Sequence, residues 1–455
     1  MAETKKQDMG TGSVKRKMVQ LAVPAVVAQV INLLYNIVDR IYIGHIPEIG
    51  AHALTGVGLF TPILMLITAF AMLAGSGGAP LAAIAMGRGE QDRAEKIMGN
   101  CFTVLLLMAV VLTGVFCAFI PELIRLFGGS GNTIPYGVSY GRIYSLGSVF
   151  VLVVMGMNPF ITTQGFAKIS MLTTVIGAVI NIILDPILIF ALDLGVAGAA
   201  IATVLSQAVS AVWILRFLTG KKTMLKLRFG NMILEPRVIL PCLGLGVSSF
   251  VMVSTESILS VSFTSSLFRY GGDVAVGAMT VLTSVNQVIS MPLVGICQGG
   301  QPLMSYNYGA GKLDRVKEAF LCQFTVCVSY ATVFWVLVQL FPSFFAGIFT
   351  NEQALVDYTA WAMRIFLAGC FSVGFQNSCQ QAFVALGQAK ISLFMACLRK
   401  LILLIPLIFI LPNFFQNKAM AVFLAEPVSD ILAAAAATTA FFLFFRRLMK
   451  TGKAE

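Results

Sequence analysis

The sequence has few charged residues and few of the residue types that soluble enzymes use for chemistry. Charged residues make up 11% of the 455 positions, and there are only two histidines and three tryptophans. Soluble domains have roughly 25% charged and 45–50% apolar residues, whereas 58% of this chain is hydrophobic. This composition excludes a soluble fold and indicates that the chain lies in a lipid bilayer.

Motifs for metal, nucleotide and covalent chemistry are also missing. The nine cysteines form no Cys-x-x-Cys pair and lie in or beside apolar runs, so we expect them to pack as small hydrophobic side chains. His45 and His52 have no nearby partners for a metal or a catalytic dyad. The turns at Gly87–Gly89 and Gly309–Gly311 lack the Lys-Ser/Thr of a phosphate loop, so ATP is not the expected energy source. We therefore predict a protein that is not an enzyme and has no cofactor.

Long apolar runs predict an all-α integral membrane protein with twelve transmembrane helices. About 20 apolar residues are needed to cross roughly 30 Å of hydrocarbon. Twelve runs reach about this length, near residues 17–43, 53–84, 97–120, 136–160, 169–190, 195–218, 238–268, 275–304, 317–342, 356–385, 392–411 and 419–445.

One sequence motif occurs twice at a constant offset. Gly77-Gly78-Ala79-Pro80 is matched 222 positions later by Gly299-Gly300-Gln301-Pro302, and each copy is followed by a Gly-x-Gly turn. The offset indicates two copies of one unit of about 220 residues. Each unit has six spans, an even number, so the units share one orientation. The chain should therefore form two six-helix lobes related by a pseudo-twofold axis along the membrane normal.

The repeated motif predicts close packing at the ends of the second and eighth spans. Its glycines allow helices to approach closely, and the structural repeat consists of Gly77, Gly78, Pro80, Gly299, Gly300 and Pro302. The following turns should end these helices, with Asp92 and Asp314 capping the next ones.

Basic residues predict the orientation. Of 31 Lys and Arg residues, 23 lie in the tails and alternate loops that share one side, or 25 with Arg399 and Lys400. The positive-inside rule then places both termini in the cytoplasm of a bacterial-type inner membrane. Because the charges are spread over short loops, the net charge of +11 does not predict nucleic-acid binding. We expect a monomer with a tail (1–16), an N-lobe (17–218), a cytoplasmic linker (219–237), a C-lobe (238–445) and a second tail (446–455).

Polar residues within the apolar runs of the N-terminal half mark candidate functional sites. Gln29, Asn32, Asn36 and Asp39 share one helical face of the first span. In the fifth span, Asn181 and Asp185 are four residues apart. Pro186 removes the hydrogen bond to the carbonyl of Ile182 and predicts a kink there. A buried network that only fixes helix packing is the alternative.

The C-terminal half carries different polar residues, which predict a water-filled cavity in which only acidic groups stand out. Each group could instead hold helices together. They are Glu256 in the seventh span, Thr280, Thr283, Asn286, Gln287, Ser290 and Met291 in the eighth, Gln376, Asn377, Gln380 and Gln381 in the tenth, and Glu426 and Asp430 in the twelfth.

These motifs resemble the MATE family of multidrug and toxic compound extrusion transporters. The resemblance rests on the duplicated layout, the paired glycine motifs, Tyr35-Asn36-x-x-Asp39, Asn181-x-x-x-Asp185-Pro186 and Gly195-Val196-Ala197-Gly198-Ala199-Ala200. The run Ala425–Asp430 is similar to the MepA-like branch. The resemblance implies secondary active export of amphipathic organic cations in exchange for Na⁺ or H⁺.

The resemblance also implies residue roles. In the N-lobe, a cation site would use Asp39, Asn181, Asp185 and Thr203, with Tyr35 and Tyr140 as neighbours. Glu256 matches an acid of the NorM-like branch, but Phe375-Gln376-Asn377 stands where that branch has a second acid, so a C-lobe carboxylate pair is in doubt. Candidate substrate contacts are Asn36, Glu256, Asn286, Gln287, Met291, Gln376 and Gln380.

The sequence leaves the coupling ion and two other functions open. Carboxylate and amide oxygens suit Na⁺, whereas two close carboxylates can share a proton. A lipid-linked precursor flippase of the same superfamily is the runner-up, although it would have a more cationic cavity. An intramembrane enzyme such as a prenyltransferase is disfavoured, because no Asp-Asp or Asp-x-x-x-Asp motif exists.

Overall fold

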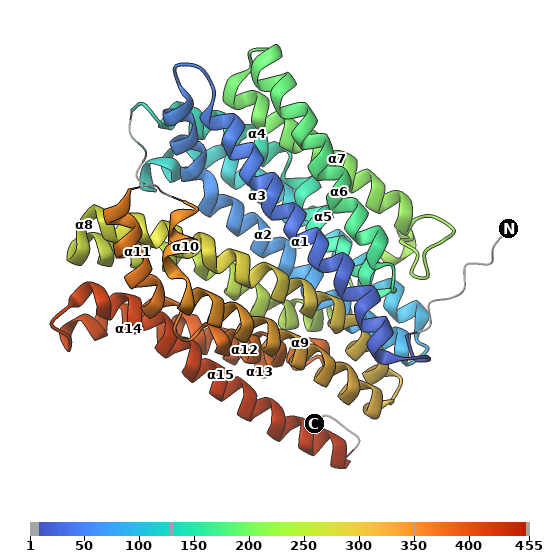
Figure 1. The fold of residues 1–455 in the computed structure, drawn as a ribbon. Helices are drawn as coiled ribbons and strands as arrows, with labels where there is room; N and C mark the ends of the chain where they lie inside the picture. The colour runs from blue at the N-terminus through green and yellow to red at the C-terminus, as the bar shows by residue number, and fades with distance from the viewer. Residues whose placement is uncertain (1–8, 128, 130, 350–351, 452–455) are drawn as a thin grey trace.

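The computed structural model is built from long helices (Figure 1) and describes residues 9–127, 129, 131–349 and 352–451. Its N-terminal half contains α1 (Val14–Gly44), α2 (Gly50–Gly87), α3 (Gln91–Leu126), α4 (Ile134–Leu146), α5 (Ser148–Thr163), α6 (Ala167–Pro186), the π-helix η1 (Ile187–Ala191) and α7 (Gly195–Leu218). Its C-terminal half contains η2 (Phe229–Asn231), α8 (Pro236–Gly309), α9 (Leu313–Leu340), α10 (Pro342–Gly347), α11 (Gln353–Phe366), α12 (Cys370–Ala385), α13 (Ala389–Cys397), the π-helix η3 (Leu398–Leu404), α14 (Ile405–Ile410), η4 (Leu411–Asn413) and α15 (Lys418–Thr451).

These helices form the twelve predicted membrane spans. Nine helices in the described part of the chain are long and apolar enough to cross a bilayer, and two bent pairs, α4 with α5 and α11 with α12, each make one more span. The 74-residue α8 contains two spans, because the backbone breaks at Gly272, where φ is 66° and ψ is −162°. A positive φ favours glycine, which has no Cβ.

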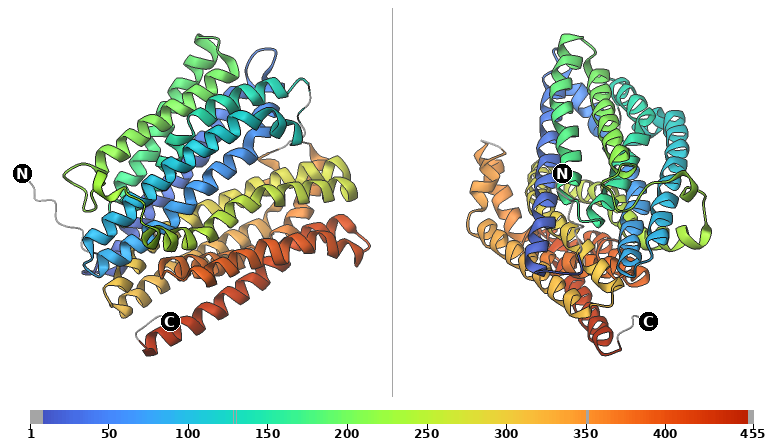
Figure 2. Two further views of the ribbon diagram at one scale, coloured as in Figure 1. Left: turned by 180° about the vertical axis from the view of Figure 1, so that it is seen from behind. Right: turned by 90° about the vertical axis from the view of Figure 1, so that its right-hand side faces the viewer.

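The two halves form two helical lobes that lie side by side, α1–α7 in blue to green and α8–α15 in yellow-green to red (Figures 1 and 2). Apolar side chains such as Phe60, Ile120 and Phe160 form the core of the first lobe, and Phe366 and Phe423 lie in that of the second. The prediction of an all-α fold with two six-helix lobes is confirmed.

The helix boundaries follow the sequence repeat. Four pairs of helices begin at the same offset as the two glycine motifs: α1 and α8 at Val14 and Pro236, α3 and α9 at Gln91 and Leu313, α5 and α12 at Ser148 and Cys370, and α6 and α13 at Ala167 and Ala389. The break at Gly272 corresponds in the same way to Gly50, where α2 begins. Each half is therefore one copy of the same six-span unit.

The repeated glycines allow the lobes to meet on the side where α1 begins and α15 ends, which we call the terminal side. A Cβ on Gly77 of α2 would collide with the carbonyl of Cys242 on α8, and one on Gly299 of α8 would collide with the backbone of Ala22 on α1. Backbone of one lobe thus packs directly on backbone of the other at two places.

A second symmetric pair of contacts lies at the very ends of the same helices. A Cβ on Gly87 would meet the carbonyl of Tyr306, and one on Gly309 would meet the carbonyl of Ile84. Because Ile84 and Tyr306 are equivalent positions of the repeat, the two contacts are related by the pseudo-twofold axis. The lobes are closed against each other at the terminal side.

Two short segments cross between the lobes. The first strap, residues 9–12, precedes α1, yet Arg315 of α9 donates hydrogen bonds to its carbonyls. The second strap, residues 231–235, precedes α8, yet Asn100 of α3 donates to the carbonyl of Asn231 and accepts from the backbone N–H of Glu235 at 2.7 Å. Each half of the chain therefore begins by binding the opposite lobe.

The helix caps differ from the sequence prediction. Asp92 and Asp314 do not cap α3 and α9, because Glu90 and Lys312 occupy the N-cap positions without a side-chain cap bond, and the two aspartates lie in the first turns. Helix α15 continues to Thr451, past the predicted end of the C-lobe. Parts of the predicted tails, residues 1–8 and 452–455, lie outside the described residues.

The glycine contacts lead to a first prediction. Valine at Gly77 or Gly299 should destabilise the protein, because its Cβ overlaps backbone atoms that cannot rotate away; overpacking of this kind typically costs about 1–3 kcal/mol. Thermal unfolding in nanodiscs should show the loss. Gly58→Val is the matched control, because Gly58 lies on α2 and a Cβ added there would have nothing within 4 Å. Normal stability with altered substrate selectivity would instead place these glycines in a binding site.

Candidate functional site

The six residues of the predicted cation site come from four helices of the first lobe and lie together. Helix α6 places Asn181 and Asp185 in its last two turns, and α7 places Thr203 in its third turn. Tyr35 and Asp39 lie near the end of α1, and Tyr140 lies on α4. Asn181, Asp185, Thr203 and Tyr140 are buried, and Asp39 is half-buried.

Asn181 lies at the centre of this group. Its Nδ2 donates to Asp185 Oδ1 at 3.2 Å and to Thr203 Oγ1 at 3.4 Å. The carboxyl groups of Asp39 and Asp185 lie close enough to interact with each other, and Tyr140 lies beside Thr203. Polar side chains of α1 and α6 thus meet inside the lobe.

Three buried oxygens in this group have no hydrogen-bond donor among the described residues. They are Asp39 Oδ1, Asp185 Oδ2 and Asn181 Oδ1. A buried acceptor without a partner is destabilising, and a buried carboxylate more so. Either a proton or a hard cation that prefers oxygen ligands would satisfy these atoms. The donor set therefore fits both.

The backbone next to Asp185 has an irregular form. Pro186 has no N–H, and the helix continues after it as the π-helix η1 rather than as a regular α-helix. Single π-helical turns inside helices are frequent at functional sites. At the position of the predicted kink, the structure therefore has a π-helical turn directly after Asp185 and Pro186.

The second lobe holds a different set of charged groups. Lys400 of η3 is hydrogen-bonded and ion-paired to Glu256 of α8 and also donates to the carbonyl of Met252 at 2.7 Å. Next to it, Arg399 contacts Asp430 of α15 at 2.7 Å and Glu426 at 3.4 Å. We call the five charged residues, Glu256, Arg399, Lys400, Glu426 and Asp430, the C-lobe charge network.

This network corrects the expectation that only acidic groups stand out in the second lobe. Arg399 and Lys400 lie within the eleventh span, with side chains 15% and 6% exposed, and both are paired with carboxylates. By sequence alone, these two residues could also be counted with the loop charges of the terminal side. Their position inside the apolar run 392–411 was the signal that could have identified them. Because both cations are paired, the second lobe does not gain the cationic surface expected of a flippase.

The remaining predicted substrate contacts fall into two groups. Asn36 and Gln287 are exposed, and Asn286 and Met291 are half-buried. Gln376 and Gln380 are buried, and Gln380 Nε2 donates to both the carbonyl and the hydroxyl of Ser392 on α13. The amide of Gln380 therefore joins two helices of the second lobe.

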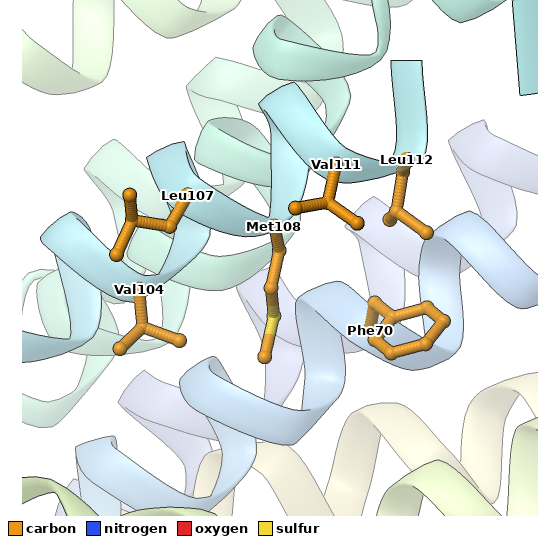
Figure 3. Close-up of a pocket in the computed structure, with 6 residues that line it drawn as sticks. All are labelled: Phe70, Val104, Leu107, Met108, Val111 and Leu112. Carbon is orange, nitrogen blue, oxygen red and sulfur yellow. The ribbon is translucent and has the colours of Figure 1, made fainter. Parts of the chain in front are cut away.

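A hollow between α2 and α3 is wholly apolar (Figure 3). Its lining residues come from α2 and α3 and are Phe70, Val104, Leu107, Met108, Val111 and Leu112. Leu107 and Val111 are exposed, as expected for a surface that contacts lipid tails. It lacks the polar groups that a site for charged ligands needs, so it is not part of the candidate site.

Comparison with known proteins gives one consistent result. A sequence model of the MatE family matches residues 24–187 and 248–410. The multidrug export protein MepA of Staphylococcus saprophyticus is 24% identical over 407 residues, covering 89% of this chain and 88% of its own. The probable multidrug resistance protein YoeA of Bacillus subtilis is 27% identical over 371 residues, covering 78% and 79%. A solved structure, the outward-facing conformation of a multidrug resistance MATE family transporter, has a TM-score of 0.92 at 23% identity and covers 99% of this chain and 100% of its own.

The charge network leads to a second prediction. Arg399→Gln should destabilise the protein by about 3–5 kcal/mol, because it leaves Asp430 and Glu426 buried without their cation. The double variant Arg399→Gln/Asp430→Asn should recover much of this loss. Thermal unfolding measures both, and Arg269→Gln, at an exposed arginine, is the control. Equal destabilisation of the single and double variants would show that Arg399 acts through packing rather than through charge.

Proposed function

The chain belongs to the MatE family, and from that premise we propose that it is a secondary active transporter that exports amphipathic organic cations in exchange for Na⁺ or H⁺. The observation that carries the proposal is a set of three buried oxygens, on Asp39, Asn181 and Asp185, that have no hydrogen-bond donor among the described residues. A site that is incomplete without a cation or a proton is what ion coupling requires.

The coupling ion binds in the first lobe. Asp39 and Asp185 lie close together within the membrane-spanning helices, where two neighbouring negative charges are unfavourable unless a proton or a cation compensates them. Na⁺ would take oxygens from both carboxylates, Asn181 and Thr203, whereas H⁺ would be shared between the two carboxylates. Tyr35 and Tyr140 complete the surroundings.

The lobe arrangement supports alternating access. The terminal side, where the lobes are closed, faces the cytoplasm in this proposal, because most Lys and Arg residues lie there. The structure then corresponds to a state closed toward the cytoplasm. If the ion and the exported compound favour opposite lobe arrangements, binding of one promotes release of the other.

The substrate contacts lie mainly in the second lobe and at the boundary between the lobes. Glu256 is half-exposed although it lies in the middle of a membrane span. A carboxylate there must face water or ligand rather than lipid, because exposure to hydrocarbon would be too costly. An amphipathic cation would bind Glu256, Asn36, Gln287 and Met291 through its charge, its polar edge and its apolar body.

The setting follows the same reasoning. We propose a monomer in a bacterial-type inner membrane, with both termini and the linker (219–237) in the cytoplasm. The lobes extend over residues 17–218 and 238–445. Its partners are small amphipathic drugs and the bilayer, and an ion gradient rather than ATP supplies the energy.

The decisive experiment measures export of a fluorescent organic cation from everted membrane vesicles. The vesicles are energised in turn by a Na⁺ gradient and by a pH gradient, each with an ionophore that collapses it as the control. Transport that depends on one gradient supports the proposal and identifies the ion. If neither gradient drives transport, the chain is not an antiporter of this kind.

A third prediction concerns Asp39. Asp39→Asn should keep the fold, because the amide has the same shape, but it should abolish gradient-driven export, because the group that the ion or proton neutralises is gone. Asp185→Asn should behave in the same way. Asp193→Asn is the matched control: Asp193 is exposed in a loop with φ of 52°, a conformation that asparagine adopts readily. Undiminished export by Asp39→Asn at normal expression would assign Asp39 to packing.

A further inference from the structure

The C-lobe charge network contains one positive charge too few. Its carboxylates are Glu256, Glu426 and Asp430, and its cations are Arg399 and Lys400. With all groups ionised, the network has a net charge of −1 within the membrane span. Such a charge is unfavourable unless a further cation or a proton compensates it.

Within the network, the pair of Glu256 and Lys400 differs from the rest. The side chain of Glu256 is 51% exposed, whereas that of Lys400 is 6% exposed and lies behind it. The residue after Glu256, Ser257, donates to Met65 Sδ of α2 in the other lobe at 3.5 Å. Glu256 therefore lies at the lobe boundary, where a ligand can reach its carboxylate without first moving a helix.

We propose that Lys400 is a built-in counter-ion, which a cationic substrate displaces from Glu256. Its ammonium group occupies, in the substrate-free protein, the place at the Glu256 carboxylate that the positive centre of an organic cation takes on binding. This inference rests on the proposed function and adds to it the residue that sets how tightly, and with what charge, a substrate is held.

The network offers Lys400 a second partner. Arg399 contacts Asp430 at 2.7 Å but Glu426 only at 3.4 Å, so Glu426 is the less firmly paired carboxylate. Lys400 already acts electrostatically on Glu426. When a substrate forms an ion pair with Glu256, the flexible side chain of Lys400 can turn toward Glu426 and form an ion pair there. All three carboxylates then have one cation each.

This charge balance predicts which substrates bind best. A monocation brings the network to neutrality, whereas a dication leaves an excess positive charge in a buried place. Removing the charge of Lys400 changes the deficit from one positive charge to two. The preference should then shift from monocations toward dications.

The test uses two fluorescent compounds with the same ring system, ethidium, a monocation, and propidium, a dication. Equilibrium titrations on the purified full-length protein in nanodiscs give Kd for the wild type, Lys400→Gln, Lys400→Arg, Glu256→Gln and the double variant Lys400→Gln/Glu256→Gln. Lys418→Gln is the control for loss of a lysine charge, because Lys418 is exposed at the start of α15.

Displacement predicts a specific pattern. Lys400→Gln should lower Kd for ethidium by about five- to tenfold, because Glu256 is no longer occupied, and should lower Kd for propidium by more. Lys418→Gln should stay within about twofold of the wild type, and Lys400→Arg, which keeps the network's charge, should change Kd less than Lys400→Gln does. In the Glu256→Gln background, Lys400→Gln should have little further effect. Glu256→Gln alone should weaken binding of both cations but not of a neutral substrate.

Two results would overturn the inference. An unchanged or higher Kd for ethidium in Lys400→Gln would show that Lys400 only supports the fold, and an equal effect in both Glu256 backgrounds would show long-range attraction without displacement. If Lys400→Gln does not fold, Kd of the double variant Lys400→Gln/Glu256→Gln, which has the same net charge as the wild type, is compared with Kd of Glu256→Gln. Equal values support displacement, and a lower Kd in the double variant shows long-range attraction instead. The gradient-driven transport assay is independent: wild-type vesicles that fail it would refute the proposed function, even where the binding pattern upholds the role of Lys400.

Discussion

The structure depends on one constraint, that an ionised side chain within a hydrocarbon layer needs a partner of opposite charge. The two lobes meet this constraint differently. In the first, Asp39 and Asp185 approach each other and leave buried acceptor oxygens without donors among the described residues, which either a proton or a cation would satisfy. In the second, Glu256 and its neighbours are paired by Arg399 and Lys400 of the same chain. The first lobe thus lacks donors for its buried oxygens among the described residues, whereas the second lobe supplies most of its own counter-charges.

The fold was predictable from the sequence because its main signals are local or periodic. Apolar runs of span length and the constant offset between the two glycine motifs suffice for twelve helices in two equivalent lobes. The features that were wrong or missing depend on details of backbone geometry. Whether Asp92 or Glu90 occupies a cap, and whether the helix after Pro186 continues as a π-helix, is decided by single hydrogen bonds that composition does not indicate.

The two sites differ in how far sequence could predict them. The first lobe's residues share helical faces, so spacing alone brings Asn181 and Asp185 together, and the resemblance supplies the rest. The charge network depends on contacts between positions 144 and 31 residues apart. The repeat could not help either, because the positions equivalent to Arg399 and Lys400 in the first unit are Gly177 and Ala178. The duplicated units have kept their architecture but not their chemistry.

The crossed straps bear on how such a molecule could have arisen. Residues 9–12 bind the second lobe and residues 231–235 bind the first, so neither unit provides the docking surface for its own leading segment. A single unduplicated copy would have needed a second copy to receive that segment. In a pair of such copies, each leading segment would bind the neighbouring copy, so the two would form a parallel homodimer with exchanged arms.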